Sequence, residues 1–324
     1  MYDNIIKPKS IQRNSKCGLI APSGKIDENQ FDKVLEKIEI LGLKPVYTNR
    51  IFKKDGYLAG NDTNRLDDLH EMFDNKEIES IICIRGGFGA TRLLQSIDYK
   101  LIAANPKIFI GYSDITALQY AFLVKAKLVT FHGVVGVSAF TDYTSKSFKN
   151  LFFDKIMNVN YFSDDFFREP DNAEFRYYNI NEGVATGNII GGNLSMMVSM
   201  TGTNFDVDYN GKIVMIEDID EYPYKIDRML THLIQATNIK NASAIVLGIF
   251  KDCSIESKKL TENDSLSLQR IFQDKFSGFQ MPVIYGFPFG HIKSQTIFPI
   301  GIKSQLNTYI NTLTYIENVF SDVI

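Results

Sequence analysis

Continuous apolar runs that alternate with helix-like segments constrain the fold of this chain more than any other feature. Residues 81–84 and 108–110 are apolar throughout rather than at every second position, which is typical of strands covered on both faces. Residues 31–41 instead carry Val34, Ile38 and other apolar side chains at helical spacing. We therefore expect an α/β protein in which a parallel sheet has helices on both faces. The same patterns predict strands over residues 17–21, 44–47, 128–131, 183–190, 212–216, 243–248 and 282–286, and helices over residues 64–72, 114–124 and 224–237.

A change of composition near the middle divides the chain. Residues 141–181 are rich in Phe, Tyr, Asp and Asn and have poor periodicity, whereas glycine-bracketed strands return after them. A chain of 324 residues is also long for a single compact core. We expect an N-terminal domain over residues 1–140, a connector with some structure of its own over residues 141–181, and a second α/β domain over residues 182–324.

Charge and hydropathy exclude several classes of protein. The chain has 35 Lys and Arg against 38 Asp and Glu, a net charge of −3, so a general nucleic-acid binder with a basic surface is not expected. No apolar stretch approaches the roughly 18 to 20 residues of a membrane span. The first residues also lack the apolar core of a signal peptide. These features predict a cytoplasmic protein that binds neither membranes nor nucleic acid.

The cysteines give no sign of a disulfide framework or a metal site. Cys17, Cys83 and Cys253 are odd in number, far apart in the sequence and outside any C-x-x-C motif. Small buried thiols are the simplest interpretation. No histidine pair with zinc-ligand spacing and no calcium-loop motif is visible either, so we expect no metal and no effect of chelators.

A glycine cluster follows the strand that ends near residue 84. Gly86, Gly87 and Gly89 let the backbone approach a ligand closely and offer N–H donors. The dinucleotide fingerprint G-x-G-x-x-G is incomplete because Arg92 stands where the third glycine would be. The glycine-rich residues 187–193 fail the phosphate-binding patterns too. These loops therefore favour an oxyanion hole over a nucleotide cofactor. Ordinary turns with no binding role are the alternative interpretation.

A serine follows the apolar strand 108–110 in a strand–turn–helix context. Gly111 permits a tight turn that projects the Ser113 hydroxyl, and the helix behind it offers unpaired N–H groups, the amide of Asp114 among them. Such a turn is typical of a nucleophile elbow, but Ile115 replaces the second glycine of the hydrolase motif. A plain helix cap is the alternative role for Ser113.

Only four histidines are available as a general base. His70 and His232 lie in predicted helices and are expected to be packed or solvated. His132 and His291 each follow an apolar strand and adjoin a glycine, and the carboxyl ends of parallel strands are where α/β sheets bind ligands. Either of these two can be the base. Glu217 comes first in an acidic group after another predicted strand, where its side chain can be aimed at an imidazole.

Eight short motifs are spread along most of the chain. They are IAPS (20–23), GND with Arg65 and Leu66 (60–66), RGGFGA (85–90), GYSD (111–114), GNIIGGN (187–193), IED (216–218), YKIDRML (224–230) and FPFGH (287–291). In this order they resemble the LD-carboxypeptidases, which include muramoyltetrapeptide carboxypeptidases and the microcin C immunity peptidases. The resemblance extends from about Gly18 to His291 and is weakest over residues 141–181 and in the C-terminal tail.

The resemblance implies a Ser–His–Glu peptidase. Ser113 would be the nucleophile, His291 its general base and Glu217 the carboxylate that orients the imidazole. The family fold pairs an N-terminal flavodoxin- or Rossmann-like parallel-sheet domain, which supplies the serine, with a C-terminal swivelling-type α/β domain, which supplies the other two. The resemblance places the active site between these domains.

The resemblance also suggests further site residues. The backbone amides of Asp114 and of Gly87 or Gly86 would form the oxyanion hole. Arg85 or Arg228 would bind a substrate carboxylate, since a guanidinium binds carboxylates bidentately. No cofactor is implied.

The family's main activity predicts the substrate. It is the release of terminal D-alanine from murein tetrapeptide in cell-wall recycling, by a cytoplasmic protein that is commonly a homodimer. Two alternatives stay open: a microcin-immunity peptidase that cleaves a peptidyl- or aminoacyl-nucleotide conjugate, and a non-catalytic binding protein on the same scaffold. A nicotinamide- or phosphate-dependent enzyme is disfavoured by the incomplete fingerprints.

Overall fold

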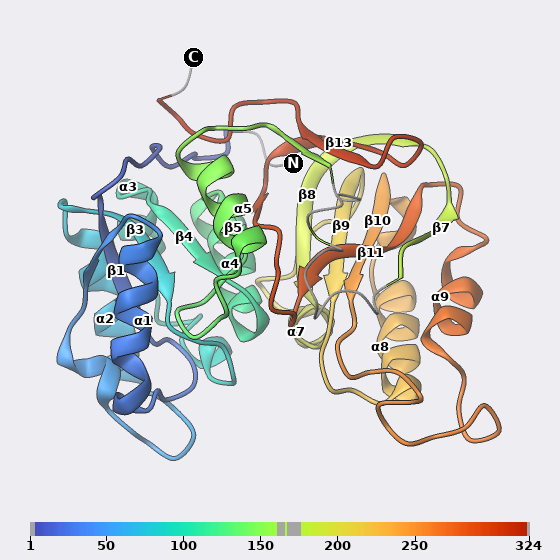
Figure 1. Ribbon diagram of the computed structural model, residues 1–324, viewed down its shortest axis with the longest axis horizontal. Coiled ribbons are helices and arrows are strands. Elements are labelled where there is room, and N and C mark those ends of the chain that lie inside the picture. Colours follow the sequence, from blue (N-terminus) through green and yellow to red (C-terminus); the bar gives the residue numbers. More distant parts are fainter. Residues whose placement is uncertain (1–3, 161–165, 167–175, 323–324) are drawn as a thin grey trace. The chain divides into compact units, whose positions relative to one another are not determined.

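The computed structural model describes residues 4–160, 166 and 176–322 and contains two compact units (Figure 1). Unit 1 comprises Met1–Ile156, Thr296–Gly301 and Asn318–Ile324, and unit 2 comprises Met157–Gln295 and Ile302–Glu317. Each unit is built on one sheet with helices, so the α/β class predicted from the sequence is confirmed.

The sheet of unit 1 is parallel except at one edge. Its strand order is β12-β5-β4-β3-β1-β2, and β12 alone pairs in the antiparallel sense. The carboxyl ends of β1, β3 and β4 therefore share one edge of the sheet. The strands are β1 (Lys16–Ile20), β2 (Lys44–Val46), β3 (Ile78–Cys83), β4 (Ile108–Gly111), β5 (Thr130–His132) and β12 (Phe298–Ile300).

The helices of unit 1 follow the apolar spacing of the sequence. In α1, Phe31, Val34 and Ile38 are buried, and Asp27 caps the amino end by accepting a hydrogen bond from the Asn29 amide. The described helices and helical turns are α1 (Glu28–Ile40), η1 (Asn49–Phe52), α2 (Asp62–Asp74), η2 (Ala90–Arg92), α3 (Tyr99–Ala104), η3 (Ser113–Ile115), α4 (Thr116–Ala121), η4 (Phe122–Ala126) and α5 (Asp142–Phe152).

Strand β12 comes from a distant part of the sequence, within the range expected for the second domain. Ile300 pairs with Thr130 and Phe298 with His132, and the ring of Phe298 stacks on the His132 imidazole at a centroid distance of 4.9 Å. Helix α5 occupies the start of the expected connector and belongs to unit 1. Connector residues 161–165 and 167–175 lie outside the described residues.

The sheet of unit 2 is mixed. Its order is β6-β14-β13-β8-β9-β10-β11-β7, in which β8 to β11 are parallel and the flanking strands antiparallel. The strands are β6 (Asn158–Asn160), β7 (Tyr178–Asn181), β8 (Val184–Asn193), β9 (Lys212–Glu217), β10 (Ala244–Ile249), β11 (Val283–Gly290), β13 (Lys303–Asn307) and β14 (Thr312–Tyr315), and the helices are α7 (Leu194–Met200), α8 (Pro223–Ala236), η6 (Ile239–Asn241) and α9 (Leu268–Phe276).

Two further features bear on the excluded classes. Cys17, Cys83 and Cys253 are buried free thiols, and burial raises the pKa of Cys17 to about 12. Over the described ranges, the helices are too short or too polar to cross a bilayer.

Candidate active site

Ser113 stands in a strained turn at the carboxyl end of β4. Its φ is 65°, a left-handed value that is uncommon outside glycine and is often found at functional sites. Its hydroxyl does not cap the helices that follow, because neither η3 nor α4 has a side-chain cap. A Cβ on Gly111 would lie 2.7 Å from Ile115 Cγ2, so the turn requires glycine there. The helix-cap role is thus not the one seen for the Ser113 hydroxyl, and its role as nucleophile stays a prediction.

The glycine loop after β3 lies against this serine. A Cβ on Gly86 would come within 2.9 Å of Ser113 Cβ and 3.0 Å of Ser113 Oγ. Gly87 and Gly89 have φ of 117° and 133°, so the loop takes a path that side-chain-bearing residues rarely adopt. The structure therefore brings together Ser113 and Gly86, as the oxyanion-hole prediction requires.

A buried arginine, to which the sequence analysis assigns no role, is hydrogen-bonded to this loop. Arg65 of α2 is 2% exposed. Its Nη1 donates to the Pro22 carbonyl at 2.5 Å and to the Gly89 carbonyl at 2.8 Å, and its Nη2 pairs with Asp62. The loops after β1 and β3 are thus tied to α2 through one guanidinium group.

We expect Arg65→Ala to destabilise the protein strongly. The substitution leaves the buried carbonyls of Pro22 and Gly89 without this donor, and each unsatisfied buried group costs about 1–3 kcal/mol. Chemical denaturation should therefore show a loss of at least about 2 kcal/mol in the free energy of unfolding. Arg92→Ala is the matched control, because Arg92 pairs with the same Asp62 but is exposed. Equal losses for both variants would contradict this interpretation.

His291 and Glu217 form a buried pair in unit 2. His291 Nδ1 lies 2.7 Å from Glu217 Oε2, and the side chains are 13% and 0% exposed. Glu217 ends β9, and His291 follows the last residue of β11. Gly290, the residue before His291, has a φ of 121°, and a Cβ on it would lie 3.2 Å from Glu217 Oε2. The glycine therefore allows the imidazole and the carboxylate to approach.

The electrostatics of this pair favour a protonated imidazole. Burial by itself lowers the pKa of His291, but the charge of Glu217, its hydrogen bond and the nearby Asp218 outweigh burial, so that the pKa of His291 is raised. In a neutral ring that donates through Nδ1, Nε2 is the nitrogen able to accept a proton, and the same carboxylate can stabilise the imidazolium that results.

The other carboxylates that follow Glu217 in the sequence also have partners within unit 2. Asp218 is 2% exposed and accepts hydrogen bonds from the Ser195 amide at 3.0 Å, the Ser195 hydroxyl at 2.8 Å and the Asn193 side chain at 3.1 Å. Burial and the charge of Glu217 raise the pKa of Asp218 to about 6. Asp220 and Glu221 pair with Lys258 and Lys225.

The alternative base, His132, is packed in the core of unit 1. It is 0% exposed, and β12 covers it through Phe298. The other two histidines are also accounted for: His70 Nε2 accepts a hydrogen bond from the Asp98 amide at 3.0 Å, and His232 is exposed on α8. Of the two candidates left open by the sequence, His291 has the Glu217 carboxylate on its ring.

The predicted substrate-binding arginines lie in different units. Arg85 is half-buried, and its Nη1 donates to the Lys25 carbonyl at 2.9 Å. Arg228 is exposed on α8 with its guanidinium 5.7 Å from the centre of the Tyr224 ring. Carboxylate binding by either one stays a prediction.

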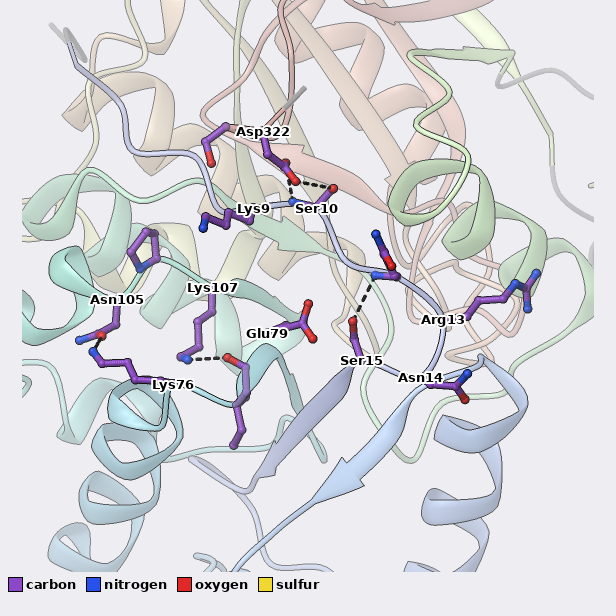
Figure 2. A pocket seen from close by; sticks show the side chains of 14 residues that line it. Lys9, Ser10, Arg13, Asn14, Ser15, Lys76, Glu79, Asn105, Lys107 and Asp322 are labelled. Atoms are coloured by element: carbon purple, nitrogen blue, oxygen red, sulfur yellow. Dashed lines mark hydrogen bonds between the residues drawn. The ribbon is translucent and has the colours of Figure 1, made fainter. Parts of the chain in front are cut away.

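A cavity of about 670 Å³ in unit 1 is lined by residues near the amino ends of β1 and β3, among them Ser15 and Lys76 (Figure 2). Ser113 instead follows the carboxyl end of β4, which is parallel to these strands. Lys107 borders the cavity and donates to the carbonyls of Asn75 at 2.6 Å and Ile78 at 2.5 Å. Burial lowers the pKa of Lys107 to about 8. This lysine ties the end of α2 to β3, so its role is structural. Within the described part of the chain, no three His, Cys, Asp or Glu side chains are grouped to hold a metal.

Comparison with known proteins identifies the family. The LD-carboxypeptidase N-terminal domain matches residues 17–133 and the LD-carboxypeptidase C-terminal domain matches residues 186–306. A probable murein peptide carboxypeptidase of Bacillus subtilis is 37% identical over 93% of this chain and 92% of its own length. The microcin C7 self-immunity protein MccF of Escherichia coli is 28% identical over 93% of this chain and 92% of its own.

A solved structure agrees with this assignment. The crystal structure of muramoyltetrapeptide carboxypeptidase from Oxalobacter formigenes matches with a TM-score of 0.79 and 28% identity, covering 92% of this chain and 97% of that one. The ordered motifs, the two α/β units and the serine at the end of β4 have the same explanation: the chain belongs to the LD-carboxypeptidase family of serine peptidases.

Proposed function

We propose that this protein is a murein tetrapeptide carboxypeptidase that hydrolyses the bond between an L-centre and the terminal D-alanine. The buried His291–Glu217 pair carries the proposal, because a carboxylate-bound imidazole at a strand end is the arrangement that a serine hydrolase needs. The substrate class is supported by the 37% identity to a probable murein peptide carboxypeptidase.

In the proposed mechanism Ser113, His291 and Glu217 act as a catalytic triad. His291 Nε2 takes the proton of the Ser113 hydroxyl, and Ser113 Oγ attacks the carbonyl carbon of the scissile bond. The resulting oxyanion receives hydrogen bonds from the amides of Asp114 and of Gly86 or Gly87. The imidazolium then gives its proton to the leaving amine of D-alanine. In the second half, His291 takes a proton from a water molecule whose oxygen attacks the acyl carbon; the bond from that carbon to Ser113 Oγ then breaks, and the imidazolium returns the proton to Oγ as the shortened peptide leaves.

Activity is expected to fall on acidification, because His291 must be neutral to accept the serine proton. The pKa of His291 is raised, so the acidic limb of kcat/KM should have its midpoint above the ordinary histidine value of about 6.5. Steady-state rates between about pH 5 and 9 measure this midpoint. A flat profile over the range would exclude His291 as the base.

Hydrolysis assays separate the proposal from its alternatives. Purified protein incubated with murein tetrapeptide should release D-alanine, detected by chromatography, and should leave a peptidyl-nucleotide conjugate uncleaved. Cleavage of the conjugate alone would assign the protein to the microcin-immunity type. The 28% identity to MccF is the reason for testing this alternative. Failure to cleave either compound, together with failure of a serine reagent to label Ser113, would support a binding protein.

We also propose, from the resemblance, that the enzyme acts in the cytoplasm as a homodimer without a cofactor. Light scattering after size-exclusion chromatography tests the dimer, and cell fractionation tests the location. A monomer at working concentrations, or protein found outside the cytoplasm, would contradict these assignments.

A further inference from the structure

We propose that the side chain of Asp114 is a positioning residue that sets the oxyanion-hole loop against Ser113. The inference rests on the proposed function, since it assumes that Ser113 is the nucleophile. It goes beyond that function because it gives the Asp114 carboxylate a role separate from that of its own amide.

The carboxylate of Asp114 links three loops at the carboxyl edge of the sheet in unit 1. Its Oδ2 accepts a hydrogen bond from Ser23 Oγ at 2.6 Å and another from the Ala90 amide at 2.8 Å. Ser23 lies after β1, Ala90 ends the glycine loop after β3, and Asp114 itself adjoins Ser113 after β4. One oxygen atom thus fastens the two neighbouring loops to the turn that carries the serine.

Two other contacts hold these neighbouring loops together without involving the serine turn. Arg65 donates to a carbonyl in each of them, at Pro22 and at Gly89, and the Gly24 amide donates to the Gly86 carbonyl at 3.2 Å. The loops after β1 and β3 therefore form one braced layer. The Asp114 carboxylate connects that layer to Ser113, and so it controls how Gly86 lies against the Ser113 side chain.

Burial of the Asp114 carboxylate costs free energy unless its hydrogen bonds compensate. Asp114 is 2% exposed, and burial raises its pKa, although the bonds from Ser23 and Ala90 lower it. Charged groups are rarely buried to this extent unless they are paired or hydrogen-bonded. An oxyanion hole needs donors within about 2.7–3.1 Å of the developing charge, and loss of one donor costs about 10²–10³ in kcat. A loop displaced by a fraction of an ångström would lose part of that factor.

The proposal predicts that Asp114→Ala lowers kcat by about 10- to 100-fold and changes KM little, since the lost interaction acts on the transition state. Asp114→Asn should recover most of the activity, because its amide oxygen can accept from both Ser23 and Ala90. A second measurement does not depend on the substrate: a fluorophosphonate probe forms a bond from phosphorus to Ser113 Oγ and releases fluoride, while His291 takes the hydroxyl proton. Its labelling rate should fall in Asp114→Ala by a similar factor.

Asp68→Ala is the matched control for a purely structural effect. Asp68 is 3% exposed in the same unit and accepts hydrogen bonds from Thr48 Oγ1 at 2.5 Å and Arg50 Nε at 2.7 Å, but it lies on α2, outside the three loops. Asp68→Ala should lower the melting temperature while the folded protein keeps its kcat and labelling rate. All rates are measured well below the melting temperature of each variant.

Two different failures are distinguishable. If the natural protein labels at Ser113 and Asp114→Ala labels equally fast with unchanged kcat, the positioning role is wrong while the serine mechanism stands. Equal losses of kcat in Asp114→Ala and Asp68→Ala would likewise overturn the role of Asp114. If the natural protein neither labels at Ser113 nor hydrolyses the tetrapeptide, the proposed function itself fails.

Discussion

Replacing Ser113 with alanine is expected to lower kcat for tetrapeptide hydrolysis by about 10³-fold or more, because the substitution removes the hydroxyl that forms the acyl-enzyme. The residual rate would come from the oxyanion donors and substrate binding alone. Stability should change little, since the Ser113 hydroxyl caps neither η3 nor α4. Released D-alanine measures the first effect and a thermal melt measures the second.

The same substitution at another serine controls for the loss of a hydroxyl as such. Ser96 is exposed in unit 1 and lies outside the three loops at the Ser113 edge, so Ser96→Ala should keep the natural kcat. Hydrolysis by Ser113→Ala within tenfold of the natural rate would exclude a serine mechanism through this residue, whatever the fate of the other site assignments.

The fold could be predicted where a buried strand or helix has a recognisable local pattern of apolar residues. The apolar runs at β3 and β4 are continuous because both faces of these strands are covered, and the spacing in α1 records its buried stripe. Strand β12 is not recognisable in this way. It is three residues long, and it belongs to unit 1 because it pairs with β5, a contact that only the folded chain determines.

The candidate site could be predicted where its reactive side chains lie at or just after the carboxyl ends of strands. Ser113, Glu217 and His291 each stand at such an end, so a search for polar side chains just after predicted strands finds them. The same search also finds His132, which lies in the core. The local sequence cannot exclude it, because the residue that covers its ring, Phe298, comes 166 positions later. The contacts of Asp114 with Ser23 and Ala90 also join residues 91 and 24 positions apart, so the local sequence points to its amide and not to its side chain.

Glu217→Gln should have an effect of similar size to that of Ser113→Ala and should also change the pH profile. An amide in place of the orienting carboxylate lowers kcat by about 10⁴-fold in the well-studied triad of another serine protease, and we expect a loss of about 10³–10⁴ here. The charge and hydrogen bond of Glu217 raise the pKa of His291. Without that charge the pKa falls, His291 stays neutral to a lower pH, and the acidic limb of the residual activity moves to lower pH.

Glu221→Gln separates this effect from a general loss of negative charge. Glu221 lies four residues further along and pairs with Lys225 at 2.9 Å on the surface of unit 2, so its substitution should leave both kcat and the acidic limb in place. Glu217→Gln should remain folded, because burial and Glu217 together raise the pKa of Asp218 and removal of one charge relieves that repulsion. If the folded Glu217→Gln protein keeps its rate within tenfold, or if its acidic limb does not move, then the Glu217 carboxylate neither orients His291 nor stabilises its protonated form, and the base must draw its reactivity from another group.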